Sequence, residues 1–351
     1  MKAWISSREV AAQNLKYVDD RRKGLITSTK TKFDKFNNAL MGGIEDNNIV
    51  TISAMSGAGK STLAKSIRDS LPILNTNRRI KQLLFNYELI AHQQLGRSVS
   101  TKFKKSLHDL YSVNEYLTDE EFERLKPYYD ELANRGVYFV EKPMTPTQMY
   151  QTMCDFYEQE CRSGNFTMIV EIDHLILALG EPKHNTNTDK VEELMNYCIR
   201  LKKEIASDGG KCIIIAISQM NRNIQNKERI ADKAQHTPLT SDLFAASAIE
   251  FASDVIVFLH QPSKLGIEKY TTAQLPTKML STLSPYPLAI PYFELVKNRS
   301  GVPNLTFPLI NKLSHFDFDE MPKEVFEELY RQMRDEGNTE PMFPTHLNYL
   351  L

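Results

Sequence analysis

The chain has 351 residues, of which 41% are hydrophobic and 25% charged, and its formal net charge is -1. These values are ordinary for a globular protein and give no overall attraction to nucleic acid. Any DNA contact must therefore come from locally placed Lys and Arg side chains. The longest apolar runs, such as residues 211–217, fall far short of the roughly 20 residues that a membrane span needs. The amino terminus lacks the apolar stretch of a secretory signal.

The four cysteines form no C-x-x-C pair and no zinc-ligand cluster with histidine. Buried thiols in a reducing compartment explain them, so a cytoplasmic location without membrane contact is expected.

Along the chain, residues 7–23 are predicted to form a polar helix with apolar residues at Val10, Leu15 and Val18. Such a helix has too little apolar area for a core of its own, so residues 1–23 are interpreted as a docking or linker segment.

From residue 48 onward, apolar runs alternate with stretches of helical periodicity. Strands are predicted at residues 49–52, 82–85, 137–140, 168–172, 212–217 and 255–259. Several of these runs are continuously apolar, which is typical of parallel strands buried on both faces. Residues 189–206 place apolar side chains at helical spacing and predict a crossover helix. Strand and helix in alternation predict an α/β fold, a doubly wound and mostly parallel sheet with helices on both faces.

Two stretches depart from this rhythm, one of them within the single domain predicted over residues 24–318. Residues 264–291 are rich in Thr, Ser and Pro and are predicted to form an insertion loop. Residues 319–351 are interpreted as a carboxyl-terminal tail with one amphipathic segment at residues 324–333.

A phosphate-binding loop follows the first predicted strand. It has the P-loop spacing, with Ala54 where the common pattern has its first Gly. Small residues let backbone N–H groups converge on phosphate oxygens, and the helix that follows adds a favourable dipole. Lys60 can reach the β- and γ-phosphates, and the Ser61 hydroxyl is placed for Mg²⁺, so ATP and Mg²⁺ are the expected ligands. The nucleotide-binding residues predicted here are Ser56, Gly57, Ala58, Gly59, Lys60, Ser61 and Thr62.

Carboxylates follow two further predicted strands. Glu88 comes just after residues 82–85, and Asp173 follows residues 168–172 directly. Both should lie at carboxyl ends of parallel strands, where this class of fold gathers its ligands. An ATPase needs one carboxylate to orient the attacking water and another to hold Mg²⁺. Glu88 could instead cap a helix, and Glu171 within the strand competes with Asp173 for the metal.

The strand at residues 212–217 ends in Ser218-Gln219-Met220-Asn221-Arg222. A glutamine at such a strand end can bond a γ-phosphate and change its contacts when that phosphate leaves. Read alone, Gln219 would be an ordinary polar residue at a strand end, and only the neighbouring motifs favour the functional interpretation.

These motifs together resemble the DnaB-like hexameric replicative helicases, which have a RecA-like ATPase core. The resemblance covers nearly the whole chain. The stretch 218–222 is similar to the family's Ser-Gln-Leu-Asn-Arg motif, and Lys297-Asn298-Arg299-Ser300-Gly301 is similar to its Lys-Gln-Arg-Asn-Gly. The resemblance implies that Glu88 is the catalytic base, Asp173 a Mg²⁺ ligand and Gln219 the γ-phosphate sensor.

Two further roles come from the same resemblance. Arg97 would contact the nucleotide base, although an ordinary helix-face arginine is an equal alternative. Lys297 and Arg299 would act on the nucleotide held by a neighbouring subunit, because a guanidinium that meets the developing γ-phosphoryl charge can be worth about 10³–10⁵ in rate. Their spacing of two residues on an extended segment points both to the same side. Without the family, they would be solvated charges at a strand end.

The resemblance also predicts which loops line a DNA channel. Residues 180–188 and 221–237 are polar and partly basic, which suits phosphate contacts, and the candidates in them are Lys183, Arg222, Lys227 and Arg229. The family's next segment, Asp-Leu-Arg-Glu-Ser-Gly-Ser, reads Asp242-Leu243-Phe244-Ala245-Ala246-Ser247-Ala248 here. Phe244 replaces the arginine that grips the DNA backbone, so backbone N–H groups from Ala245 to Ser247 would have to bind the phosphate instead.

The leading hypothesis is therefore an ATP-dependent replicative DNA helicase that moves on single-stranded DNA as a homohexameric ring. A 5′-to-3′ direction is what the family implies. We expect the chain to lack the primase-binding amino-terminal domain of bacterial members, which would suit a phage protein in its host's cytoplasm. Primase and a helicase loader remain candidate partners. The alternatives are a RecA- or RadA-like recombination or remodelling ATPase and a nucleotide-timed assembly protein.

Overall fold

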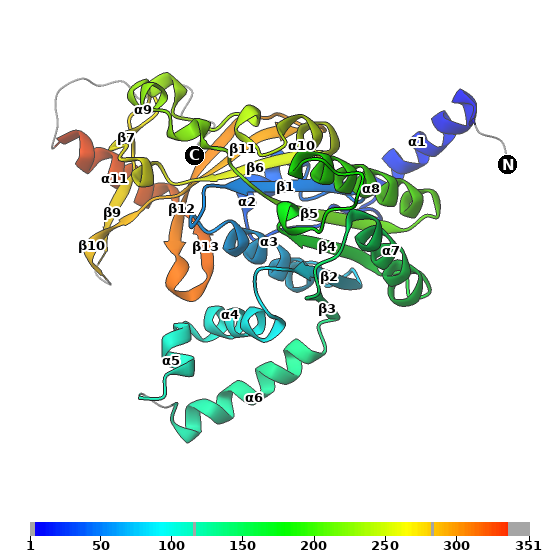
Figure 1. Ribbon diagram of the computed structural model, residues 1–351, viewed down its shortest axis with the longest axis horizontal. Coiled ribbons are helices and arrows are strands. Elements are labelled where there is room, and N and C mark those ends of the chain that lie inside the picture. The colour runs from blue at the N-terminus through cyan, green and yellow to red at the C-terminus, as the bar shows by residue number, and fades with distance from the viewer. Residues whose placement is uncertain (1–3, 115–116, 282–283, 336–351) are drawn as a thin grey trace.

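The computed structural model describes residues 4–114, 117–281 and 284–335. Its centre is a nine-stranded sheet in the order β13-β12-β11-β6-β1-β5-β4-β2-β3 (Figure 1). The strands of this sheet are β1 (Asn48–Ala54), β2 (Ile80–Asn86), β3 (Val137–Val140), β4 (Thr167–Asp173), β5 (Lys211–Gln219), β6 (Val255–His260), β11 (Tyr292–Asn298), β12 (Leu305–Lys312) and β13 (Asp317–Glu320).

The six strands from β6 to β3 are parallel, and β11, β12 and β13 continue the sheet in antiparallel pairing. All six predicted strands are present, each within two residues of its expected bounds. The central strands are buried along nearly their whole length, since successive side chains enter hydrophobic cores on opposite faces of the sheet. In β5, for example, Ile214 enters one core while Ile213 and Ile215 enter the other.

Helices cover both faces, so the predicted doubly wound architecture is confirmed. On one face lie α7 (Pro146–Phe156), α8 (Asn187–Ser207) and α10 (Ala246–Ala252); on the other lie α2 (Asp34–Ala39) and α3 (Lys60–Leu74). The crossover helix α8 begins two residues before the predicted start, because Thr186 and Asp189 form a capping box there.

One single helix and one group of three helices stand away from the sheet (Figure 1). The helix α1 (Ser7–Arg22) has no buried residue, and it is tied to the body by Arg21, which pairs with Glu45 at 3.0 Å. Between β2 and β3 the chain forms α4 (Ala91–Phe103), α5 (Leu107–Tyr111) and α6 (Asp119–Ala133). These three helices carry a small core of their own around Val99 and Tyr128.

The region after β6 differs from expectation. The sequence predicts a loop over residues 264–291, but the structure has two short strand pairs there, β7 (Lys269–Tyr270) with β8 (Leu275–Pro276) and β9 (Lys278–Ser281) with β10 (Ser284–Ala289). These strands are too short and too rich in Pro to show an alternating pattern. They pack with α11 (Lys323–Asp335), the predicted amphipathic segment of the tail, in a core that includes Tyr270 and Phe326. Residues 336–351 lie outside the described part of the chain.

The remaining helix is α9 (Lys227–Ala231), and single 3-10 turns connect several elements, including those at Pro262–Leu265 and Leu313–His315. Within the described residues, no helix combines the length and the apolar character needed to cross a membrane.

A buried carboxyl group should make stability depend on pH. Glu294 on β11 is buried, accepts a hydrogen bond from the Tyr270 hydroxyl at 2.7 Å, and also contacts Thr306. Burial raises the pKa of Glu294 from 4.5 to about 7. The folded protein therefore holds this proton at pH values where the unfolded chain has lost it, and the stability linked to it disappears as pH rises from about 4.5 through 7.

We expect Glu294→Gln to remove this dependence. Between about pH 5 and pH 8 the free energy of unfolding of the unaltered protein should fall by about 2–3 kcal/mol more than that of the variant. Urea unfolding followed by circular dichroism at several pH values measures the difference. Glu268→Gln, at an exposed position nearby, is the control and should keep the full slope. Equal slopes for all three proteins would show that Glu294 does not titrate in this range.

Candidate nucleotide site

The loop between β1 and α3 has the shape that a phosphate cradle requires. Gly57 and Gly59 have positive φ angles of 69° and 96°, and Gly59 precedes the first residue of α3, Lys60. A Cβ atom on Gly59 would lie 2.9 Å from side-chain atoms of Leu313 and Phe318, so only glycine fits. The loop thus brings Lys60 and Ser61 to the amino end of a 15-residue helix, where the helix dipole favours an anion.

The other predicted loop residues occupy different positions. Ser56 and Gly57 are exposed at the tip, whereas Ala58 and Thr62 are buried. The Ala58 N–H donates to the Met55 carbonyl at 3.1 Å, so in this arrangement it closes the turn and does not face a phosphate.

The parallel sheet places the polar strand ends in one row. Because β1, β5, β4 and β2 are neighbours, the P-loop, Gln219, Asp173 and Glu88 follow four consecutive strands at the same edge. The register aligns Ala54 with Gln219 and Asn86 with Asp173. The sequence-predicted residues of this half of the site are therefore brought together.

Asp173 is the buried charge at the centre of this row. Burial raises its pKa, while a hydrogen bond from Ser61 and the charge of Lys60 lower it. Its Oδ1 atom is buried and has no hydrogen-bond partner among the described residues; the same holds for both side-chain amide atoms of Asn86. Unpartnered buried polar atoms beside a P-loop suit a polar ligand, and a carboxylate with a hydroxyl is the oxygen donor set that Mg²⁺ prefers. The residues present therefore fit a Mg²⁺–nucleotide.

Glu171, the competitor for the metal, is removed from the site by an ion pair. Its Oε1 lies 2.7 Å from Nη1 of Arg68 on α3, and both side chains are almost fully buried. Burial raises the pKa of Glu171 to about 7, a shift that the Arg68 charge opposes. This leaves Asp173 as the carboxylate of β4 that faces the loop.

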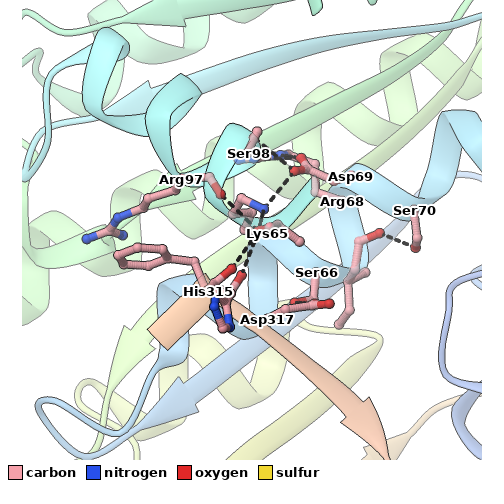
Figure 2. A network of polar contacts seen from close by, with 12 residues as sticks. Lys65, Ser66, Arg68, Asp69, Ser70, Arg97, Ser98, His315 and Asp317 are labelled. Atoms are coloured by element: carbon pink, nitrogen blue, oxygen red, sulfur yellow. Dashed lines mark hydrogen bonds and ion pairs between the residues drawn. The ribbon is translucent and has the colours of Figure 1, made fainter. Parts of the chain in front are cut away.

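Arg68 also belongs to a larger polar network that attaches α4 to α3 (Figure 2). Asp69 pairs with Arg68 at 2.8 Å and with Lys65 at 3.1 Å, and it accepts a hydrogen bond from Ser98 on α4 at 3.2 Å. Lys65 also donates to the Thr101 hydroxyl at 2.9 Å. Since α4 follows Glu88 and carries Arg97, this network sets the position of both relative to the P-loop helix.

Arg97 points back toward the carboxylates. Burial lowers its pKa, and the charges of Asp173 and Glu88 oppose that shift. Its guanidinium lies 4.7 Å from the centre of the Phe316 ring, a cation–π contact. Arg97 therefore lies near Asp173 and Glu88, at the edge of the candidate nucleotide site.

Lys297 and Arg299 lie at the opposite ends of the strands, away from the P-loop. The strand β11 runs antiparallel to β6, and Asn298 aligns with Val255, which in turn aligns with Val50 at the start of β1. The P-loop begins at the far end of β1, roughly 13 Å away at about 3.3 Å per residue. Both cations contact the last turn of α10: Lys297 bonds the Glu250 carbonyl and Arg299 the Phe251 carbonyl. Neither can serve the P-loop of its own chain from this position.

The predicted DNA-binding residues differ in their surroundings. Arg222 and Lys227 are exposed on the segment after β5. Lys183 is half-exposed, but it pairs with two glutamates of its own surface. Arg229 is nearly buried in a two-pronged ion pair with Asp242, at 2.6 and 2.8 Å, and donates to two carbonyls. The expectation that Arg229 contacts DNA is therefore not retained, because its donors are used inside the protein.

The segment around Phe244 also has a structural explanation. Phe244 packs against the core under α8 and α10. Ala245 has a φ angle of 52° and precedes the first residue of α10, while Ser247 is exposed. The position that holds an arginine in the resembling family thus faces inward here.

The family model described as "DnaB-like helicase C terminal domain" matches residues 28–306. The chain belongs to this family. Membership supports a helicase function for the chain and implies an ATP-hydrolysing helicase domain. Among curated proteins, none matches the chain.

Two solved structures show the same RecA-like fold. One is described as an "ATPase Domain", with a TM-score of 0.69 and 16% identity over 89% of this chain and 98% of that one. The other comes from "The Structure Of A DnaB-Like Replicative Helicase And Its Interactions With Primase", with a TM-score of 0.64 and 18% identity over 85% of this chain. The DnaB-like chain described here spans 64% of that second protein.

Sequence reasoning missed three features of the site. Asn86, Phe316 and the Arg68 ion pair carry no motif, and the signal for Asn86 was only its place two residues before Glu88. Phe316 and Arg68 meet the site through pairings between segments far apart in the chain, which no local pattern reveals.

The buried pair of Arg68 and Glu171 should be costly to break. Arg68→Ala leaves the Glu171 carboxylate buried without its cation, so the free energy of unfolding should fall by about 3–5 kcal/mol. Urea denaturation measures this change. Lys105→Ala, which breaks a pair with Glu121 that is about one third exposed on each side, should cost no more than about 1 kcal/mol. A loss for Arg68→Ala as small as that of the control would contradict the importance of the buried pair.

Proposed function

We propose that this DnaB-like chain is an ATP-dependent replicative DNA helicase that assembles into a ring, hexameric by family resemblance, and moves on single-stranded DNA. The observation that carries this proposal is the division of the candidate site between two edges of one sheet. The P-loop and Glu88 lie at one edge, and Lys297 and Arg299 lie at the other. Two copies arranged head to tail would bring the two halves together, and such contacts close into rings when the rotation permits.

Exposed apolar side chains support a contact between copies. Phe251 and Val302, which flank the basic pair, are 73% and 75% exposed. On α1, Leu15 is 73% exposed and Val18 is 55% exposed. A free monomer gains nothing from these surfaces, whereas a neighbouring protomer could cover them. We propose that α1 docks on one neighbour while Arg299 reaches the nucleotide site of another.

Each residue then has a distinct chemical task. The P-loop backbone, apart from the Ala58 N–H that closes the turn, binds the phosphates together with the Lys60 ammonium. Ser61 and Asp173 would hold Mg²⁺, which when bound neutralises phosphate charge. Glu88 is exposed at the edge of the site and accepts a proton from the attacking water. Lys297 and Arg299 of a neighbouring copy stabilise the charge that develops on the γ-phosphoryl oxygens.

Gln219 links the site to the segment after β5. It ends β5 beside the P-loop, and the next residue, Met220, donates its N–H to the Ala54 carbonyl at 3.0 Å. We propose that Gln219 bonds the γ-phosphate and that loss of this phosphate shifts residues 221–242.

The proposed contacts to the DNA phosphates lie on and beside that segment. They are Arg222, Lys227 and the backbone from Ala245 to Ser247, with Lys183 in a subsidiary role because it is already paired. A 5′-to-3′ direction and contacts with a primase or a loader are further proposals.

Unwinding tests the proposal directly. The purified protein should displace one strand of a forked duplex, and only with hydrolysable ATP. ATPase activity without any strand displacement, over a range of fork designs and salt concentrations, would count against a helicase. In that case, filaments seen by electron microscopy with ATP and single-stranded DNA would favour the strand-exchange alternative.

Glu88→Gln tests the catalytic base. The substitution keeps the size of the side chain and removes its basicity, so kcat should fall at least about 10²-fold while the affinity for ATP changes little. Steady-state ATPase assays and equilibrium nucleotide binding separate the two effects. Glu120→Gln, at an exposed position on α6, is the matched control and should retain full activity. A Glu88→Gln variant with near-normal kcat would assign the base to another residue.

Mixing two inactive variants tests the shared site. Arg299→Ala should lose most of its ATPase activity but still bind nucleotide through its own P-loop. Combined in equal amounts with Glu88→Gln subunits, random assembly leaves about one interface in four with both residues intact. Partial recovery of ATPase activity is the expected result. No recovery, with mixed assemblies confirmed by mass spectrometry, would argue that both residues act within one chain.

A further inference from the structure

Residues 261–271, which follow β6 and end just after β7, contact two parts of the molecule that matter to the proposed function. At one end it contacts the P-loop. At the other end it contacts residues 222–242, the segment after Gln219. We call residues 261–271 the bridging segment. In Figure 1, β7 at the end of this segment lies beside α9 of residues 222–242.

The first end holds the P-loop by its carbonyl groups. Gln261 is buried, and its side-chain amide donates to the Ala58 carbonyl at 3.1 Å. Lys264 donates its ammonium group to the Gly57 carbonyl. A phosphate is bound by the N–H groups of such a loop, so contacts to the carbonyls hold the loop without competing for the ligand. Two consecutive carbonyls of the P-loop are therefore attached to one short turn.

The other end holds His236. The ring of Tyr270 lies parallel to the His236 ring, with 6.2 Å between centres and 5° between planes. The Thr271 N–H donates to His236 Nδ1 at 3.3 Å, and His236 Nε2 donates to the Ile230 carbonyl at 2.7 Å. His236 thus connects the bridging segment to α9.

Between these ends the segment is stiff. Residues 262–265 form a 3-10 turn, and β7 pairs with β8. Tyr270 is fully buried, and its hydroxyl contacts Glu294 at 2.7 Å and His260 at 3.0 Å. Ile267 is buried in the same core. A short, packed element with polar contacts at both ends can carry a displacement from one to the other, which a loose loop cannot.

We propose that the bridging segment carries the state of the P-loop to residues 222–242, with Gln261, Lys264 and His236 as positioning residues. This link would work beside the direct connection through Gln219, and it rests on the proposed function only in taking nucleotide binding at the P-loop as the signal. A change in the Gly57 and Ala58 carbonyls on nucleotide binding would move the first end of the segment, and through Tyr270 it would move His236 and α9.

Hydrogen exchange of the full-length protein, with and without a saturating non-hydrolysable ATP analogue, tests the link. In the unaltered protein, exchange of the backbone amides of residues 229–242 should change several-fold on binding. Lys264→Met and His236→Phe should reduce that change to less than about twofold, because each removes one polar attachment of the segment. Lys264→Arg, which keeps a donor for the Gly57 carbonyl, and Glu268→Ala, an exposed neighbour, should preserve it. Fluorescent nucleotide titration confirms equal occupancy of the site in every protein.

The outcomes separate this link from the helicase proposal. An undiminished change in both Lys264→Met and His236→Phe would overturn the link and leave Gln219 as the route, even if unwinding is observed. A lack of any change at residues 229–242 in the unaltered protein would overturn it as well. If the change is present and the two variants lose it, the link stands, whether or not the protein separates DNA strands.

Discussion

The parallel alignment of β1, β5, β4 and β2 is the constraint on which the rest of the site depends. Parallel neighbours end at the same edge of a sheet, so a loop, a glutamine and two carboxylates from distant parts of the chain meet there. The strand β11 runs antiparallel to β6, so Lys297 and Arg299 lie at the opposite ends of the strands. A site that needs both groups has to be completed by another copy of the chain, and this gives the proposed oligomer a chemical reason.

Buried ion pairs hold the elements of this site in their relative positions. Arg68 on the P-loop helix pairs with Glu171 on β4. On the same helix, Asp69 pairs with Arg68 and Lys65 and accepts a hydrogen bond from Ser98 on α4. A buried ion pair is weak evidence for added stability, but its directed bonds favour one relative position of the elements that it joins. Here those elements carry the P-loop lysine, the two carboxylates of β4 and Arg97 of α4. The two carboxylates of β4 thus have different partners, Arg68 for Glu171 and Ser61 for Asp173.

Contacts between distant segments decide features that local sequence patterns do not reveal. Arg229 has the exposed, basic sequence context of a DNA contact, yet Asp242 takes its donors because the chain turns back between them. Residues 264–291 show no strand pattern, yet β7 to β10 form beside a core that Tyr270 shares with α11. Phe244, which stands where the resembling family has an arginine, adds to the packing under α8 and α10. In the proposed function, the DNA phosphate contacts therefore rest on Arg222, Lys227 and the backbone from Ala245 to Ser247, and not on Arg229.

The sequence by itself determined the positions of the central strands along the chain, the phosphate loop and the polar residues near the strand ends. These features are local: apolar runs, small residues before a Lys-Ser pair, and carboxylates at strand ends appear within a few positions of one another. Only the tertiary structure decided which carboxylate faces the loop, which arginines remain available and that Lys297 and Arg299 lie away from their own P-loop. Those outcomes depend on strand order, register and direction, because pairing energies between distant segments leave no periodic trace along the chain.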